Sequence, residues 1–258
     1  MSQILHYKSY GAIDKPCVVL IHGLFGSSDN LSVIRRALEN DYFVINIDLP
    51  DHGESPWSDA FSFKRSAQQL ASTLQHIGIS SASFVAHSLG GKVAMTLCHM
   101  QAQLINHLII LDMAPVAYEP RHHNVISGLT NVDLATVQSR KDAQLQLSEH
   151  VKDVGTAAFL LKSLYNDDGI WKWRFNLKML VRDYPILSKW DLTDELVFTG
   201  KVLFIKGQHS DYITSQHQAI IKQQFPNATA KIINAGHWLH AEKRTIVNTL
   251  ITKYLNGY

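Results

Sequence analysis

Ser88 is the residue of this sequence best placed to act as a nucleophile. It lies in residues 86–91 (AHSLGG), between an apolar run that predicts a strand and a pattern that predicts a helix. A serine on such a sharp turn exposes its hydroxyl, and the small residues around it permit the turn. Ala86 is the first small residue, where the usual pattern has glycine. The alternative interpretation is a serine that only caps the helix.

His237 is placed to serve as the general base for that serine. It follows an Ala-Gly pair just after the last predicted strand, and a loop there can carry a base to a nucleophile on another strand. It also comes after Ser88, as the chain order serine, acid, histidine requires. The sequence contains 14 histidines, so position rather than residue type distinguishes this one. His240 lies where the next helix begins, and we expect it to be structural.

A histidine–glycine turn after an early strand is suited to binding a developing negative charge. Residues 22–26 (HGLFG) follow the apolar run Cys17–Ile21 directly. Such a turn presents backbone N–H groups, and the N–H after the nucleophile supplies a second donor. We therefore expect an oxyanion hole made by the amides of Leu24 and Leu89, with Phe25 as a weaker substitute. The alternative is an ordinary glycine-rich turn.

Short apolar strands alternate with amphipathic helices along most of the chain. The strands lack polar alternation, as strands covered on both faces should. This alternation predicts an α/β protein with a mostly parallel, doubly wound sheet and helices on both faces. The predicted strands are 17–21, 42–47, 83–86, 107–111, 202–206 and 230–233, with an edge strand at 5–10, and the helices are 30–38, 63–78, 91–101, 215–224 and 242–255.

Residues 115–190 interrupt this alternation. They contain helical segments at 142–149 and 156–164, followed by an aromatic, basic run at 171–175. An insertion between two core strands would lie over the carboxyl ends of the sheet. We therefore expect a mainly helical lid at 115–190, inserted after the sixth strand, and a core made of 1–114 and 191–258.

Composition limits the function classes. The chain has 258 residues, 46% of them hydrophobic, and a formal net charge of +2 without a dense basic cluster, which argues against a nucleic-acid surface. Cys17 and Cys98 are interpreted as buried thiols in a reduced compartment. The first ten residues do not resemble a signal peptide, and no apolar run approaches the ~20 residues of a membrane span. A cytoplasmic protein is expected. The pair His122-His123 lacks further ligands, so no metal is assigned.

With these residues placed, the chain resembles the α/β-hydrolase superfamily over essentially its full length, and within it the YbfF-type bacterial esterases. The matching segments are 22–27 (HGLFGS), 48–55 (DLPDHGES), 87–92 (HSLGGK), 111–115 (LDMAP) and 173–176 (WRFN). The resemblance implies an α/β-hydrolase fold and cleavage of carboxylic esters or thioesters through an acyl-enzyme, without a cofactor. The partner would be a small-molecule substrate, and the protein a monomer or small homo-oligomer. The lid would shape an acyl pocket, with Phe25, Phe159, Leu160, Trp171 and Trp238 as substrate-binding residues.

Two aspartates compete for the role of the triad acid. In most members of the superfamily the acid follows the penultimate strand, but here that position holds Ser210, and Asp211 comes one residue late. Asp112 ends the strand expected beside that of the nucleophile, from which an acid can still reach the base. The esterase subgroup is similar in placing its acid there. We therefore choose Asp112, with Ser210 as a supporting hydrogen-bond partner of the histidine, and keep Asp211 as second choice.

Rival functions share the same fold. A C–C bond hydrolase and the lyase of menaquinone biosynthesis use the same triad, and a non-catalytic ligand-binding protein is the alternative outside enzymes. The intact pair of Ser88 and His237 argues against a dead site. Lys92, just after the serine turn, is expected to be a solvent-facing helix residue rather than a base.

Overall fold

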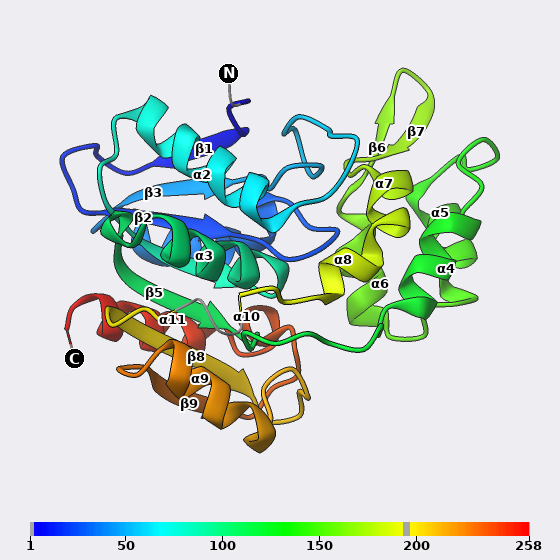
Figure 1. Cartoon of the computed structure of the whole chain (residues 1–258). Helices are drawn as coiled ribbons and strands as arrows, with labels where there is room; N and C mark the ends of the chain where they lie inside the picture. The colour runs from blue at the N-terminus through cyan, green and yellow to red at the C-terminus, as the bar shows by residue number, and fades with distance from the viewer. Residues whose placement is uncertain (1–2, 193–196, 258) are drawn as a thin grey trace.

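A seven-stranded sheet forms the centre of the molecule in the computed structural model, which describes residues 3–192 and 197–257. The strand order is β1-β3-β2-β4-β5-β8-β9 (Figure 1). β1 pairs antiparallel with β3, and every other pair in the sheet is parallel. The strands are β1 (Tyr7–Tyr10), β2 (Cys17–Ile21), β3 (Phe43–Ile47), β4 (Ala82–His87), β5 (Ile105–Leu111), β8 (Lys201–Gly207) and β9 (Thr229–Ile233).

The central strands form because their residues can be buried on both faces. All five residues of β3 and all six of β4 are buried. Strands covered by helices on both sides need such continuous apolar runs. The mostly parallel, doubly wound sheet predicted from the sequence is confirmed, and each predicted core strand overlaps an observed one.

Helices cover the sheet on both faces and divide the core into two apolar clusters. One cluster lies under α2, α3 and α9, and the other under α1, α10 and α11. Figure 1 shows α2, α3 and α9 in front of the sheet. These helices are α1 (Ser32–Leu38), α2 (Phe63–Ile77), α3 (Leu89–Met100), α9 (Gln218–Gln224), α10 (Leu239–Glu242) and α11 (Arg244–Leu255). In the described ranges no helix is both long and apolar enough to cross a membrane.

A group of mostly helical elements separates β5 from β8 in the chain. Figure 1 shows it beyond the ends toward which the strand arrows point. The predicted position after the sixth strand is wrong for this chain, because a single strand, β1, precedes the parallel strand β2 and makes β5 the fifth. The elements are α4 (His123–Asn131), α5 (Arg140–Ser148), α6 (Val154–Leu161), β6 (Leu164–Asp167), β7 (Ile170–Trp173), α7 (Leu177–Arg182) and α8 (Tyr184–Ser188).

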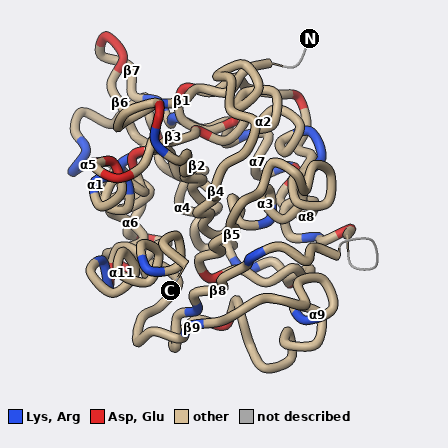
Figure 2. The backbone as a smooth tube through the Cα atoms, turned by 90° about the vertical axis from the view of Figure 1, so that its left-hand side faces the viewer, with Lys and Arg blue, Asp and Glu red and all other residues tan. Residues whose placement is uncertain are grey.

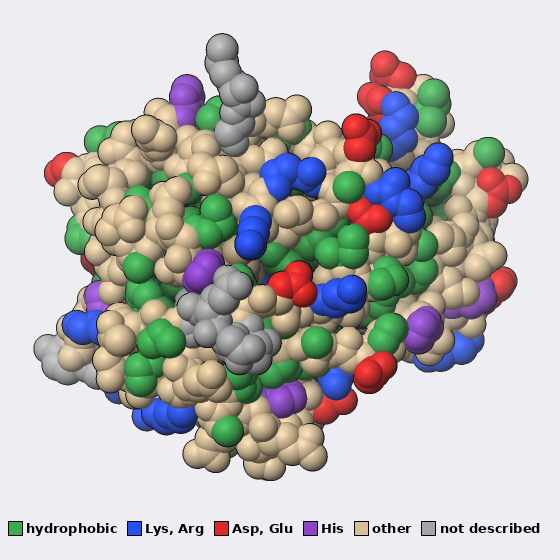
Figure 3. Space-filling view, viewed as in Figure 1, with side chains coloured by type: hydrophobic (Ala, Val, Ile, Leu, Met, Phe, Trp, Pro, Cys, Tyr) green, Lys and Arg blue, Asp and Glu red, His purple; other side chains and the backbone are tan. Residues whose placement is uncertain are grey.

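The inserted segment also contains a hairpin that the helical pattern did not predict. β6 and β7 pair antiparallel, with Leu164 opposite Trp173. Asp168 and Gly169 form the turn at φ 49° and 89°, left-handed values that an Asp-Gly pair tolerates. Figure 2 shows acidic residues at this tip, and in Figure 3 acidic and basic side chains are interspersed on the face in view.

Candidate active site

The sharp turn predicted around Ser88 is present between β4 and α3. Ser88 has φ 52° and ψ −119°, a conformation that side chains rarely adopt and that recurs where a nucleophile must be exposed. Gly90 allows the turn to form, because a Cβ there would lie 2.5 Å from the His22 carbonyl oxygen and 2.7 Å from that of Ile21. The Ser88 hydroxyl is therefore held at the carboxyl end of β4, beside the turn that follows β2.

His237 joins Ser88 to Asp112 through its two ring nitrogens. Its Nε2 lies 3.0 Å from Ser88 Oγ, and its Nδ1 lies 2.8 Å from Asp112 Oδ2. The three side chains come from the ends of β4 and β5 and from the loop after β9. A serine, a base and an orienting carboxylate in this geometry can generate a nucleophile at neutral pH.

Several donors fix the orientation of the Asp112 carboxylate. The side chain is fully buried, Gly207 N–H donates to Oδ1 at 3.0 Å, and Ser210 Oγ donates to Oδ2. We expected Ser210 to form a hydrogen bond with His237, but in the structure its hydroxyl bonds Asp112 instead. The reason is that Oδ2 lies between them and can accept from both groups.

Asp211, the second candidate for the acid, points away from this arrangement. Its side chain is 79% exposed and forms an ion pair with Arg121, with a 2.7 Å distance between Oδ1 and Nη1. Residues 208–213 form a turn and a bend after β8. In this segment Ser210 faces Asp112 while Asp211 faces solvent.

Leu24 and Leu89 are the residues expected to supply the amides of the oxyanion hole. Both line the cavity that the serine hydroxyl enters. Leu89 is the first residue of α3, so its N–H has no acceptor within the helix. The N–H of Phe25 donates to His52 Nε2 at 3.1 Å and is therefore already used, which removes Phe25 as a substitute.

Buried neutral histidines brace the turns around the site. Burial lowers the pKa of His52 and of His240 to about 3 and holds that of His87 well below its usual value. The His87 ring lies 3.0 Å from the His237 carbonyl oxygen and donates its Nε2 proton to it. His22 accepts from Leu49 N–H at 3.0 Å. These contacts position the backbone on both sides of Ser88 and His237.

The cavity beside Ser88 has a volume of about 40 Å³ and is lined by a mixture of apolar, aromatic and charged residues. The expected pocket residues lie elsewhere. Leu160 is buried in the core, and Phe25 packs on Phe175 with ring centroids 5.1 Å apart. The side chains that line the cavity with Ser88 are Leu24, Leu89, Lys92, Met113, Tyr118, Glu119, Arg121, His122, Tyr184, Leu187, Ser188 and Tyr212.

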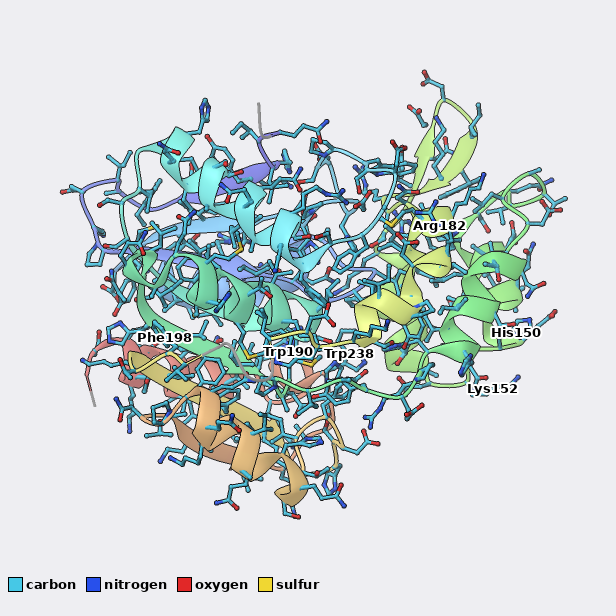
Figure 4. All side chains as sticks on the ribbon, viewed as in Figure 1. His150, Lys152, Arg182, Trp190, Phe198 and Trp238 are labelled. Carbon is cyan, nitrogen blue, oxygen red and sulfur yellow. The ribbon has the colours of Figure 1, made fainter. Side chains whose placement is uncertain are left out.

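The three other expected pocket residues lie around the insertion. Phe159 and Trp238 have ring centroids 4.1 Å apart, and Trp238 lies 5.5 Å from the His237 ring. Trp171 is half-buried in the β6–β7 hairpin. Figure 4 shows Trp238 near the junction between the sheet and the inserted segment. All three are half-buried, and none of them lines the cavity beside Ser88.

The tyrosines of the cavity were not singled out by the sequence. Tyr212 is stacked on the ring of His237, and its carbonyl accepts from Tyr118 Oη at 2.6 Å. Tyr118 follows the Leu-Asp-Met-Ala-Pro segment, and Tyr212 follows Asp211, so proximity to these motifs was the only available signal.

Lys92 corrects another expectation. It is 2% exposed rather than facing solvent, and it lines the same cavity as Ser88. Its ammonium donates to backbone carbonyls about a hundred residues further along the chain, at Ser188 and Lys189. A local helical pattern does not contain this information, because the covering segment comes from the insertion.

No group of three or more His, Cys, Asp or Glu side chains within 3–192 and 197–257 has the arrangement of a metal site. In the pair His122-His123, both ring nitrogens of His122 contact tyrosine hydroxyls, those of Tyr184 and Tyr212.

Comparison with known proteins gives consistent matches across the chain. A family model described as "alpha/beta hydrolase fold" matches residues 16–153. Esterase YbfF of Escherichia coli (strain K12) is 39% identical, over 93% of this chain and 92% of the relative. The protein named sn-1-specific diacylglycerol lipase ABHD11 of Mus musculus is 32% identical, over 96% of this chain and 84% of its own length.

The architecture matches a solved structure as well. A protein described as "Marine microorganism esterase" superposes with a TM-score of 0.94 at 30% sequence identity, over 98% of this chain and 99% of that structure. The similarity therefore includes the inserted segment as well as the sheet.

Proposed function

This chain belongs to the α/β-hydrolase fold family and is an esterase-type hydrolase, and we propose that it cleaves carboxylic esters or thioesters through a serine acyl-enzyme. One observation carries the mechanistic part of the proposal. The contacts from Ser88 Oγ to His237 Nε2 (3.0 Å) and from His237 Nδ1 to Asp112 Oδ2 (2.8 Å) form a continuous path for activating the serine. The reaction uses side chains and backbone amides only, without a cofactor.

In the first step, His237 Nε2 removes the Ser88 proton while the serine oxygen attacks the acyl carbonyl carbon. The negative charge moves to the former carbonyl oxygen, where the amides of Leu24 and Leu89 stabilise it. Asp112 stabilises the imidazolium that forms. Collapse of the intermediate breaks the carbon–oxygen or carbon–sulfur bond, and His237 gives its proton to the departing alcohol or thiol.

In the second step, water hydrolyses the acyl-enzyme. His237 takes a proton from the water as its oxygen attacks the acyl carbon, and the same amides stabilise the second oxyanion. The proton then returns to Ser88 Oγ as the serine ester bond breaks. The products are a carboxylic acid and the free enzyme.

The inserted segment is proposed to act as a lid over this site. Tyr118, Tyr184 and Leu187 belong to residues 115–190 and line the cavity beside Ser88. Residues 1–114 and 191–258 would then form the catalytic core. A wall made by the insertion can exclude water and select the acyl group.

Active-site labelling and ester hydrolysis test the proposal together. A fluorophosphonate probe is expected to label the wild-type protein at Ser88, and p-nitrophenyl esters are expected to be hydrolysed. Ser88→Ala should abolish both. Undiminished hydrolysis by Ser88→Ala would contradict the serine mechanism. A folded wild-type protein that takes up no label and hydrolyses no ester would favour a ligand-binding protein.

A substrate panel separates ester hydrolysis from other reactions of the same triad. It should contain oxygen esters, thioesters, a diketone and the lyase substrate of menaquinone biosynthesis. We expect kcat/KM to be highest for an ester or thioester. Preferred turnover of the diketone or lyase substrate would replace the proposed reaction while keeping Ser88 and His237 in their roles.

A further inference from the structure

Lys92 carries a buried amino group beside the proposed active site that the mechanism does not use. It lies on α3 one turn after Ser88, with its backbone N–H 3.3 Å from the Ser88 carbonyl oxygen. Burial lowers the pKa of its ammonium to about 7, although the negative charge of Asp191 acts in the opposite direction. Burying an ammonium is costly unless specific contacts compensate for the lost water.

Those contacts lie where the inserted segment returns to the core. Lys92 Nζ donates to the carbonyl oxygens of Ser188 at 3.2 Å and of Lys189 at 2.8 Å. Ser188 is the last residue of α8 and Lys189 is its C-cap. The carbonyl oxygens at the end of a helix accept no hydrogen bond from within the helix, so they are available to Lys92. Lys92 therefore connects the helix that carries the nucleophile to the last helix of the insertion.

Tyr118, near the start of the insertion, also contacts Ser188. The N–H of Tyr118 donates to the Ser188 carbonyl oxygen at 2.9 Å, so this oxygen accepts from both Tyr118 and Lys92. Lys92 Nζ also lies 5.0 Å from the centre of the Tyr118 ring, within cation–π range. The outgoing and returning chains of the insertion are thus joined at one amino group, and we call residues 118 and 187–189 the neck of the insertion.

The neck is also a wall of the cavity. Tyr118, Leu187 and Ser188 line it together with Ser88 and Lys92. Any displacement of the neck relative to α3 therefore changes the space available next to the serine.

From these contacts we infer that Lys92 is a positioning residue that holds the neck of the insertion against α3 and thereby sets which acyl groups fit beside Ser88. This inference rests on the proposed ester hydrolysis. A methionine would fill a similar volume without a desolvation cost, so the specific contribution of lysine is the direction of its N–H donors. Lys92 does not touch the reacting atoms and transfers no proton.

The test compares Lys92→Met with Lys92→Arg and with the exposed lysine of α11 in Lys253→Met. Steady-state kcat and KM are measured for p-nitrophenyl esters of increasing acyl length. Lys92→Met is expected to change the ratio of kcat/KM between long and short esters by about 10-fold or more, chiefly through KM. Lys92→Arg should recover part of the wild-type ratio because it keeps charge and donors, and Lys253→Met should keep all of it.

Amide hydrogen exchange tests the neck without any substrate. In Lys92→Met the Tyr118 amide, which donates to Ser188, is expected to exchange about 10-fold faster, while the amides of β4 remain unchanged. If Lys92→Met does not fold, the same two measurements on Lys92→Gln decide. A folded variant with wild-type selectivity and wild-type exchange at Tyr118 overturns the inference.

The two proposals fail in different ways. If the wild-type protein hydrolyses none of the esters, or Ser88→Ala remains active, the proposed function fails while the exchange result still reports on the neck. If the wild-type protein is an active esterase and Lys92→Met keeps its selectivity and exchange, only the role of Lys92 is wrong.

Discussion

The ring of Tyr212 lies almost parallel to the ring of His237, with centroids 4.0 Å apart and planes inclined by 21°. Tyr212 Oη lies 3.2 Å from Nε2 of His122, whose Nδ1 lies 2.6 Å from Tyr184 Oη. The orientation of the proposed base is therefore connected to α8 of the insertion. Stacking restricts rotation of the imidazole while both of its nitrogens remain free to bond Ser88 and Asp112.

Substitutions of Tyr212 should separate ring stacking from hydrogen bonding. Tyr212→Phe keeps the ring, so we expect its kcat to stay within about 3-fold of the wild-type value, whereas Tyr212→Leu should lower kcat by about 10-fold because the imidazole loses its constraint. Steady-state kinetics with one p-nitrophenyl ester measure both. Equal kcat values for Tyr212→Leu and wild type would show that the stack does not position the base.

Exchanging carboxylates for amides should identify the acid. Asp112→Asn is expected to lower kcat by roughly 10³–10⁴-fold, because an amide cannot stabilise the imidazolium and favours the wrong tautomer. Asp211→Asn removes a carboxylate of the same size that pairs with Arg121 at the surface, and it should stay near the wild-type rate. A crippled Asp211→Asn beside a nearly normal Asp112→Asn would reverse the assignment.

Ser210 should contribute through Asp112. Its hydroxyl donates to the oxygen that also accepts from His237. A hydrogen bond to a charged group contributes about 1.5–3 kcal/mol, so Ser210→Ala should lower kcat by about 10- to 150-fold with little change in KM. The exposed Ser80→Ala is the matched control. An unchanged kcat in Ser210→Ala would show that the Gly207 amide alone orients the acid.

Buried histidines should make the fold sensitive to acid. Burial lowers the pKa of His52 and His240 to about 3 and that of His122 to about 4, whereas an unfolded histidine titrates near pH 6.5. Below about pH 6.5 the unfolded chain binds more protons than the folded one, so the free energy of unfolding falls as pH falls through this window. Each such histidine contributes about 1.4 kcal/mol per pH unit.

Urea unfolding of wild type and His240→Leu at several pH values checks this linkage. His240 has a ring nitrogen, Nδ1, without a hydrogen-bond partner among the described residues, so leucine removes a titrating group without breaking a hydrogen bond at this atom. Between about pH 6 and pH 4.5, the slope of unfolding free energy against pH should be smaller in His240→Leu by about 1.4 kcal/mol per unit. Identical slopes would show that His240 is protonated in the folded protein.

The core was predictable because its strands are continuous apolar runs. β2 begins and ends at the predicted residues, Cys17 and Ile21, and β5 ends at the predicted Leu111. The order of Ser88, Asp112 and His237 could be inferred because each follows a predicted strand, and parallel strands bring their carboxyl ends to one edge. Ser88 and Asp112 follow buried runs, whereas β9, which was expected to be covered on both faces, is an edge strand whose first four residues are exposed. The β6–β7 hairpin was missed although Asp168-Gly169, a recognised hairpin turn, was present in the sequence.

The cavity wall was not predictable in the same way. The burial of Lys92 depends on carbonyl groups 96 and 97 residues away, and backbone carbonyls have no signature in sequence. The Ser210 hydroxyl likewise bonds Asp112 rather than His237 because Asp112 Oδ2 lies between the two side chains. Periodicity reports that a residue is buried, but the identity of its neighbours is set by tertiary packing.

The placement of His237 after β9 has a consequence for how the protein becomes active. β9 is an edge strand that pairs with β8 alone, and it precedes only the last two helices. Ser88 and Asp112 lie at the ends of the adjacent strands β4 and β5, whereas the position of His237 depends on the pairing of β9 with β8. On the proposed mechanism, a nascent chain that lacks residue 237 contains the nucleophile but not its base. After denaturation, turnover can therefore return only once β9 has paired with β8.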